Sequence, residues 1–152
     1  MKRVFLSALL FVLHALDSLA AGEACFRYEP AVVQLSGRLM LRTFPGPPNY
    51  ESIQKGDRAE TQALLELDRP ICVLADAKDG PNSDDERDQR VVTLVPASGL
   101  RAARNTGARV RVEGTLFHAQ TGHHRTAVLI EAKRITRLGG RGTGPTRTDQ
   151  TK

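Results

Sequence analysis

Three histidines lie close together near the end of the sequence. His118, His123 and His124 fall within seven residues, separated by the turn-forming stretch Ala119 to Gly122. This spacing predicts a hairpin that brings His118 beside one of the other two histidines. Two neighbouring imidazoles bind zinc or copper when an acidic side chain supplies a further ligand. The acidic side chains that other parts of the fold can supply are Glu51, Asp57 and Glu113.

No carboxylate lies next to these histidines in the sequence. The alternative to a metal site is therefore a polar hairpin whose imidazoles bond the backbone or each other, or contact a partner. A hydrolase that uses one of them as a base, with Thr121 or Thr126 as the hydroxyl, is a further alternative. No Gly-x-Ser-x-Gly, phosphate-loop or dinucleotide-binding motif occurs. The sequence thus favours a non-catalytic protein.

A proline-rich loop is the second candidate binding region. Pro45 to Asn49 reads PGPPN and is flanked by Phe44 and Tyr50. A stiff loop loses less entropy when it binds a partner, and loops on a rigid scaffold often carry function. We therefore expect Phe44, Asn49 and Tyr50 to contact a protein or a small ligand. The alternative is that the two aromatic rings close one end of a barrel.

The elements that position these residues are predicted to be β-strands. Six segments show the alternation or the short apolar runs that are typical of strands. They span residues 31–44, 61–67, 71–76, 89–95, 108–118 and 126–138. Pro70 leaves open whether the second and third form a short hairpin or one bulged strand. Residues 97–105 predict a short helix with Ser98 as its N-cap, ended by Gly107.

Two glycines and one break in periodicity indicate that the sheet curves. Gly37 shares the inward parity of Val33, Leu35, Leu39 and Leu41, which favours a bulge or a tight bend there. Gly114 falls on the apolar side of its own strand in the same way. The apolar phase of the last strand slips by one residue near Lys133–Arg134, which predicts a bulge. We predict an all-β, OB-like Greek-key barrel of five to six strands, with one short helix before the last hairpin. An open antiparallel sandwich is the alternative.

The N-terminus has the layout of a secretory signal peptide. Lys2 and Arg3 precede the apolar run Val4 to Leu13, and small residues follow up to Gly22. The run is too short to span a bilayer. Residues 1–20 are therefore predicted to be cleaved after Ala20, which leaves a periplasmic or secreted chain without a stable membrane anchor. Cleavage after Gly22, a retained anchor and a lipoprotein linked through Cys25 are the alternatives; the charged Glu23 argues against the last.

Cys25 and Cys72 are the two cysteines of the chain and lie 47 positions apart. An even count in an exported protein favours one disulfide over two buried thiols. Residues 21–138 are predicted to form a single β-barrel domain. Residues 139–152 contain basic and polar side chains with no large apolar group, which predicts a disordered basic tail.

Two stretches resemble a known family. One is Gly37-Arg38-Leu39 leading into Phe44 to Ile53 and Gly56-Asp57, and the other runs from Val112 to Thr126. Both are similar to the small exported bacterial proteins of domain of unknown function 4431, in which the cysteines fall at corresponding places. The resemblance covers nearly the whole chain after the leader. It implies an exported, disulfide-bearing β domain and implies no activity.

The function that the sequence favours is a non-catalytic binding module in the bacterial envelope, whose partner is a protein or a small ligand. The net charge of +5 comes largely from the two ends of the chain, and tryptophan is absent. Single-stranded nucleic acid is bound by stacking on aromatic side chains, so nucleic acid is not an expected partner. A metal protein that binds zinc or copper through His118, His123 and His124 is the second hypothesis. A small hydrolase with a histidine base is the third.

Overall fold

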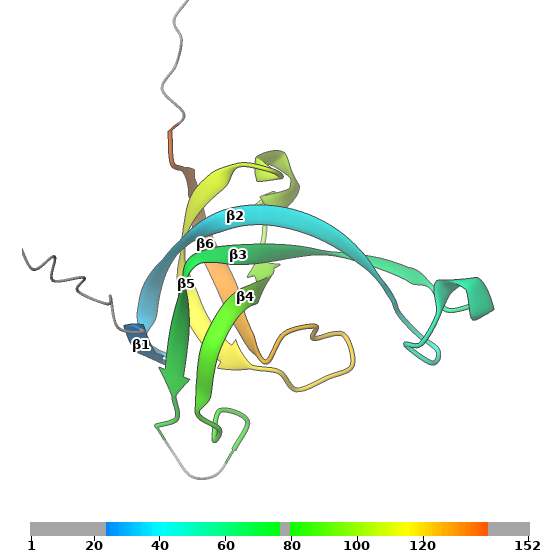
Figure 1. The fold of residues 1–152 in the computed structure, drawn as a ribbon, viewed down its shortest axis with the longest axis horizontal. Helices are drawn as coiled ribbons and strands as arrows, with labels where there is room; N and C mark the ends of the chain where they lie inside the picture. Colours follow the sequence, from blue (N-terminus) through cyan, green and yellow to red (C-terminus); the bar gives the residue numbers. More distant parts are fainter. Residues whose placement is uncertain (1–23, 77–79, 140–152) are drawn as a thin grey trace, which may run out of the picture.

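The computed structural model describes residues 24–76 and 80–139. The predicted signal peptide and nearly all of the predicted tail lie outside the described residues. Within them the protein is almost entirely β (Figure 1). The strands are β1 (Ala24–Arg27), β2 (Val32–Pro45), β3 (Ala59–Leu74), β4 (Glu86–Pro96), β5 (Arg109–His118) and β6 (Val128–Arg137). Two short 3-10 helices are η1 (Ile53–Lys55) and η2 (Ala102–Asn105).

Five of the strands close into a barrel. β3 pairs antiparallel with β2 and with β4, β2 with β5, and β5 with β6. The parallel pairing of β4 with β6 completes the ring. β1 is an additional strand that adds to β3 in parallel at the outer edge. A five-stranded Greek-key barrel with η2 before the last hairpin is the OB-like architecture that the sequence predicts.

Gly37 and Gly114 stand where strand backbones approach each other too closely for a side chain. Gly37 pairs with both Leu67 of β3 and Val110 of β5, so it is the corner at which β2 changes partners. A Cβ atom at Gly37 would lie 2.1 Å from the Glu66 carbonyl oxygen, and one at Gly114 would lie 2.0 Å from that of Glu131. These contacts explain why both positions are glycine.

The register confirms the predicted bulge and resolves the question at Pro70. Glu113 pairs with Arg134 and Gly114 with Ala132, so Lys133 is the extra residue in β6. β3 passes through Pro70 as one irregular strand rather than a hairpin, and its pairing with β4 shifts between Glu66 and Ile71. β4 starts at Glu86, three residues before its predicted start. The helix before the last hairpin is η2, a single 3-10 turn.

The core fills the barrel with aliphatic side chains from every barrel strand. Leu39, Leu65, Val92, Val112 and Ile130 are all fully buried. Tyr28, which follows β1, is also buried, and its hydroxyl donates a hydrogen bond to the Asp84 carbonyl oxygen at 3.0 Å. Among residues 24–76 and 80–139 no helix has both the length and the apolar character needed to cross a membrane.

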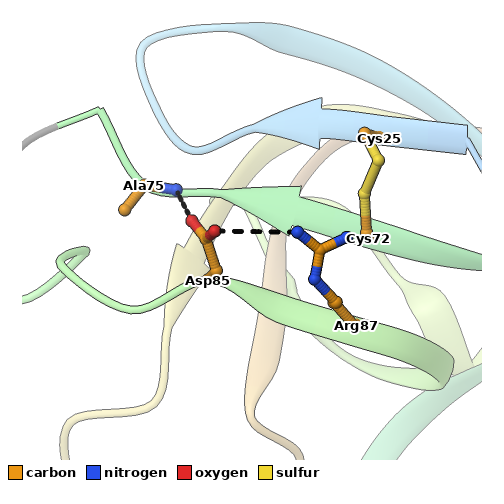
Figure 2. The surroundings of a disulfide bond; sticks show 5 residues. All are labelled: Cys25, Cys72, Ala75, Asp85 and Arg87. Atoms are coloured by element: carbon orange, nitrogen blue, oxygen red, sulfur yellow. Dashed lines mark hydrogen bonds and ion pairs between the residues drawn. A yellow bond between two sulfur atoms is a disulfide. The ribbon is translucent and has the colours of Figure 1, made fainter.

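The disulfide ties β1 to the barrel, as predicted. Cys25 and Cys72 face each other in the parallel register, with Cα atoms 4.4 Å apart (Figure 2). Nearby, Asp85 accepts a hydrogen bond of 2.9 Å from the Ala75 N–H and lies 4.0 Å from Arg87. A disulfide is compatible with a periplasmic or extracellular location, where thiols are not kept reduced.

Candidate functional site

The loop between β2 and β3, residues 46–58, is built around one carboxylate. Asp57 accepts hydrogen bonds of 2.8 Å from the backbone N–H groups of Asn49, Glu51 and Ser52. The Asn49 side-chain amide adds a fourth at 3.3 Å. These hydrogen bonds lower the pKa of the Asp57 carboxyl below its ordinary value, and the one from the Ser52 N–H has the largest effect. The loop is therefore held by its own polar groups, without an apolar core.

Tyr50 sits in this loop with a backbone φ of 61°, in the left-handed region. A residue with a Cβ pays roughly 1–2 kcal/mol for that conformation. The N–H groups on either side of Tyr50 are both among those bound by Asp57, and this holds the turn in place. The strained turn directs the Tyr50 ring toward the loop between β5 and β6, residues 119–127.

The two loops meet at His123. The Tyr50 hydroxyl lies 2.9 Å from Nε2 of His123, and Nδ1 lies 3.0 Å from Glu60 at the start of β3. A carboxylate only accepts hydrogen bonds, so Nδ1 donates to Glu60, and in the tautomer with its proton on Nδ1 the ring accepts the Tyr50 O–H at Nε2. Gln62 fixes the same histidine by donating its side-chain N–H to the His123 carbonyl oxygen at 2.5 Å.

Arg125 reinforces this junction from the β5–β6 loop. Its guanidinium lies 5.2 Å from the Phe44 ring centre and 5.6 Å from that of Tyr50, which allows cation–π attraction to both rings. It also donates to the Pro45 carbonyl oxygen and lies 3.8 Å from Glu60. We call the set of Phe44, Tyr50, Glu60, His123 and Arg125 the loop junction.

The other two histidines have separate partners. Both ring nitrogens of His118 lie against oxygen atoms of the protein, the Ala119 carbonyl at 3.0 Å and Glu86 at 2.9 Å, so both positions are already occupied by partners. Nδ1 of His124 accepts from the Gln120 N–H at 2.8 Å. Among the described residues no group of three or more His, Cys, Asp or Glu side chains could hold a metal ion. The geometry therefore does not support the three-histidine zinc or copper site.

A groove opens beside the loop junction and is lined by residues of β3 and β4 together with η2. Its volume is about 750 Å³, within the range of small-molecule sites. The apolar part of its surface comes mainly from β4 and η2, with single residues from β2, β3 and β6. These apolar residues are Leu41, Ala63, Leu94, Val95, Pro96, Ala102, Ala103 and Leu129. The polar part consists of Thr61, Gln62, Thr93, Arg101, Arg104, His123 and His124.

Leu41 corrects one sequence expectation. Its parity places it on the inward face of β2 with Leu39, yet Leu39 is fully buried whereas 41% of Leu41 is exposed. Beyond Arg38 the pairing of β2 with β5 ends, while its pairing with β3 continues to Pro45. β2 and β3 extend together beyond the barrel, to the right in Figure 1, and Leu41 lines the groove instead of the core.

The sequence of the second half of the barrel resembles one known family. Residues 89–136 match the family model described as Domain of unknown function (DUF4431). This part of the chain is therefore similar to the DUF4431 family. No curated protein and no solved structure gives a significant match to the chain. The DUF4431 match includes η2 and the β5–β6 loop, whereas the β2–β3 loop and Glu60 lie outside the matched residues.

The two candidate regions found in the sequence thus come together, although not as a metal site. Tyr50 and His123 are in direct contact, Phe44 packs against Arg125, and the side-chain amide of Asn49 bonds to Asp57 within its own loop. His118 lies apart from this contact. Sequence reasoning missed Glu60 and Arg125 at the junction, and Arg101 and Arg104 at the groove. The sequence signal for the groove was Leu41, an apolar residue that continues the strand alternation beyond the part of β2 that is buried in the barrel.

Proposed function

We propose that this protein is an exported, non-catalytic binding module that holds a small ligand or a short segment of a partner protein in the groove over β3 and β4. One observation carries the proposal: an apolar groove of about 750 Å³ lies beside two loops that side-chain contacts hold together. OB-type barrels commonly bind ligands on this strand face and between these two loops. The fold supplies this analogy, and the exposed apolar side chains supply the physical driving force.

A neutral fluorescent probe tests whether the groove binds apolar ligands. We expect N-phenyl-1-naphthylamine to bind the purified protein and to shift the amide NMR signals of Ala63, Val95 and Ala102. Leu41→Glu should weaken binding at least about fivefold because it places a charge in the apolar floor. Val32→Glu is the matched control, since Val32 is 60% exposed on the same strand and does not line the groove.

Two results would count against a binding groove. In one, the probe does not bind or shift any groove signal. In the other, Leu41→Glu and Val32→Glu reduce binding equally, which would place the probe elsewhere on the surface.

Export is tested by the N-terminus of the protein recovered from cells. The proposal expects the chain to begin at Ala21 and to contain the oxidised Cys25–Cys72 pair. Intact-mass measurement before and after reduction determines both the N-terminal residue and the oxidation state of the two cysteines. A chain that retains Met1 and reduced thiols in the cytoplasm would contradict export.

A hydrolase is the second candidate, because Glu60, His123 and Tyr50 form a carboxylate–imidazole–hydroxyl chain with both contacts at hydrogen-bond distance. In such a chain the carboxylate orients the imidazole, and Nε2 takes the proton from the hydroxyl. Turnover of p-nitrophenyl acetate that is lost in both Tyr50→Phe and His123→Gln would favour this function. Equal rates in these variants and the parent protein favour a structural role for the chain.

A further inference from the structure

The titratable side chains that line the groove are all arginines or histidines. Arg101, which precedes η2, and Arg104 of η2 line it on one side, and His123 and His124 line it from the β5–β6 loop, while no carboxylate of the described residues lines it. The floor between them is aliphatic. The groove therefore combines an apolar surface with positive charge contributed by η2 and the residue before it.

The guanidinium groups of Arg101 and Arg104 differ from several others in the protein. Arg27 and Arg109, for example, form ion pairs of 2.9 Å and 2.7 Å with Asp76 and Asp68. Within residues 24–76 and 80–139 no ion pair or side-chain hydrogen bond is formed by the guanidinium of Arg101 or Arg104. Both residues are exposed at the groove, so their N–H donors are available to an anion.

His124 supplies a further donor to the groove. Burial, and then the neighbouring His123, lower the pKa of the His124 imidazole, which favours the neutral ring. Because Nδ1 accepts the Gln120 N–H, the proton of that neutral ring is on Nε2. In the described part of the chain Nε2 of His124 has no hydrogen-bond partner. The histidine thus carries an N–H, and not a lone pair, at Nε2.

We propose that the groove takes a free single-chain amphiphile, a hydrocarbon chain that ends in a carboxylate. The hydrocarbon lies on the aliphatic floor around Leu41 and Ala63, and the carboxylate accepts hydrogen bonds from Arg101 and Arg104. Charge complementarity selects the anionic head, and the open apolar floor selects the chain. This inference rests on the proposed binding function and names the chemical class of its ligand.

A series of ten-carbon probes with different head groups tests the inference. Decanoate, decanol and decyltrimethylammonium are titrated below their micelle concentrations, with amide NMR shifts and calorimetry as readouts. We expect decanoate to bind at least about tenfold more tightly than the other two, since hydrogen bonds to charged groups are among the stronger ones. Its dissociation constant should fall roughly two- to fourfold for each added CH₂ until the groove is filled.

Paired arginine variants separate recognition from general charge. Arg101→Gln/Arg104→Gln should reduce decanoate affinity about tenfold or more and leave decanol affinity unchanged. Arg111→Gln/Arg134→Gln removes the same charge from exposed positions on β5 and β6 outside the groove lining, and should leave decanoate binding unchanged. A far-ultraviolet spectrum of each variant confirms that the fold is retained.

The remaining outcomes distinguish failure of the inferred ligand class from failure of the proposed binding function. Equal binding of decanoate and decanol overturns the anionic head group and leaves the binding groove in place. Binding to vesicles of anionic phospholipid, but not to free decanoate, overturns the free amphiphile in favour of a membrane surface. Loss of decanoate binding in the control variant overturns the role of Arg101 and Arg104. If decanoate, decanol and the neutral probe all fail to bind, the proposed function fails together with the inference.

Discussion

β2 and β3 run side by side through two different surroundings. In the barrel, Leu39 and Leu65 pair across the two strands and are fully buried. Two residues further along β2, Leu41 pairs with Ala63 and is 41% exposed. The alternation of apolar side chains continues through both regions, but only the first has an opposing layer. An apolar strand face therefore becomes core or binding surface according to what covers it.

The two regions are also stabilised by different interactions. The barrel gains stability from burial of aliphatic side chains, which is nondirectional and large in sum. The β2–β3 extension ends in the loop held by Asp57 and in the loop junction at His123 and Arg125, where directional polar contacts replace burial. Changes in the junction should thus affect the groove wall while the barrel stays folded.

The largest expected effect lies in the barrel, at Gly114. Gly114→Val places a Cβ 2.0 Å from the Glu131 carbonyl oxygen, which cannot move without breaking the β5–β6 pairing. We expect a loss of roughly 4 kcal/mol or more, or failure to fold. Gly122→Val in the β5–β6 loop is the control, because its nearest contact, the Tyr50 ring, is 3.6 Å away. Similar urea midpoints for the two variants would contradict the division between barrel and loops.

The disulfide should contribute the next largest effect. Cys25→Ser/Cys72→Ser removes a cross-link between residues 47 positions apart, which stabilises the fold by about 4 kcal/mol in the chain-entropy model. Because β1 lies at the outer edge of β3, binding of the neutral probe should persist in the folded variant. Urea unfolding and probe titration measure the two properties. Unchanged stability would show that the disulfide does not stabilise the fold by constraining the unfolded chain.

Leu39→Ala and Leu41→Ala compare the two surroundings directly. Leu39→Ala should cost about 2–5 kcal/mol because it leaves a cavity in the core. Leu41→Ala should change stability by less than about 0.5 kcal/mol and should weaken probe binding instead. Denaturant unfolding and probe titration of both variants give the comparison. If both variants lose the same stability, a layer of the protein covers Leu41 and the groove interpretation is wrong.

The smallest effect should appear only at alkaline pH. Burial first, and then the negative charges of Glu86, Asp84 and Asp85, raise the pKa of Tyr28 from 10.0 to about 12. The unfolded chain therefore loses this proton before the folded one, so the contribution to stability is complete below pH 10 and is lost as the pH rises toward 12.

The pH effect is measured as the melting temperature between pH 9 and pH 12. Tyr28→Phe should flatten this part of the profile relative to the parent protein. Tyr50→Phe is the control, since Tyr50 lies in the loop junction and not in the core. If both substitutions flatten the profile equally, the loss of stability at alkaline pH is not due to Tyr28.

Much of the barrel was predictable because strand alternation reports which side chains share a face. Gly37, Gly114 and the one-residue slip at Lys133 marked the corner and the bulge correctly, since each breaks the local pattern for a steric reason. β1 was not predicted, because four residues are too few to show a period. The continuous course of β3 through Pro70 was left open, since it depends on strand partners on both sides.

The candidate site was predictable only in part. The histidine hairpin and the Phe44 to Tyr50 loop were both identified, but their contact was not, because Tyr50 and His123 are 73 positions apart. The hydrogen-bond partner of each imidazole depends on differences in position of about an ångström, which the sequence does not specify. Glu60 and Arg125 have no local sequence signal that distinguishes them from other charged residues on strand and loop surfaces.

The sequence by itself determined the β class, the cysteine pair, the glycine corners and the two loops that carry unusual residues. These features follow from local periodicity, side-chain size and composition. Only the tertiary structure decided that the loops meet through Glu60, His123 and Tyr50, and that Leu41 faces a groove. The physical reason is that a pattern specifies which face of a strand is apolar, whereas closure of the barrel determines how far along the strand that face is covered.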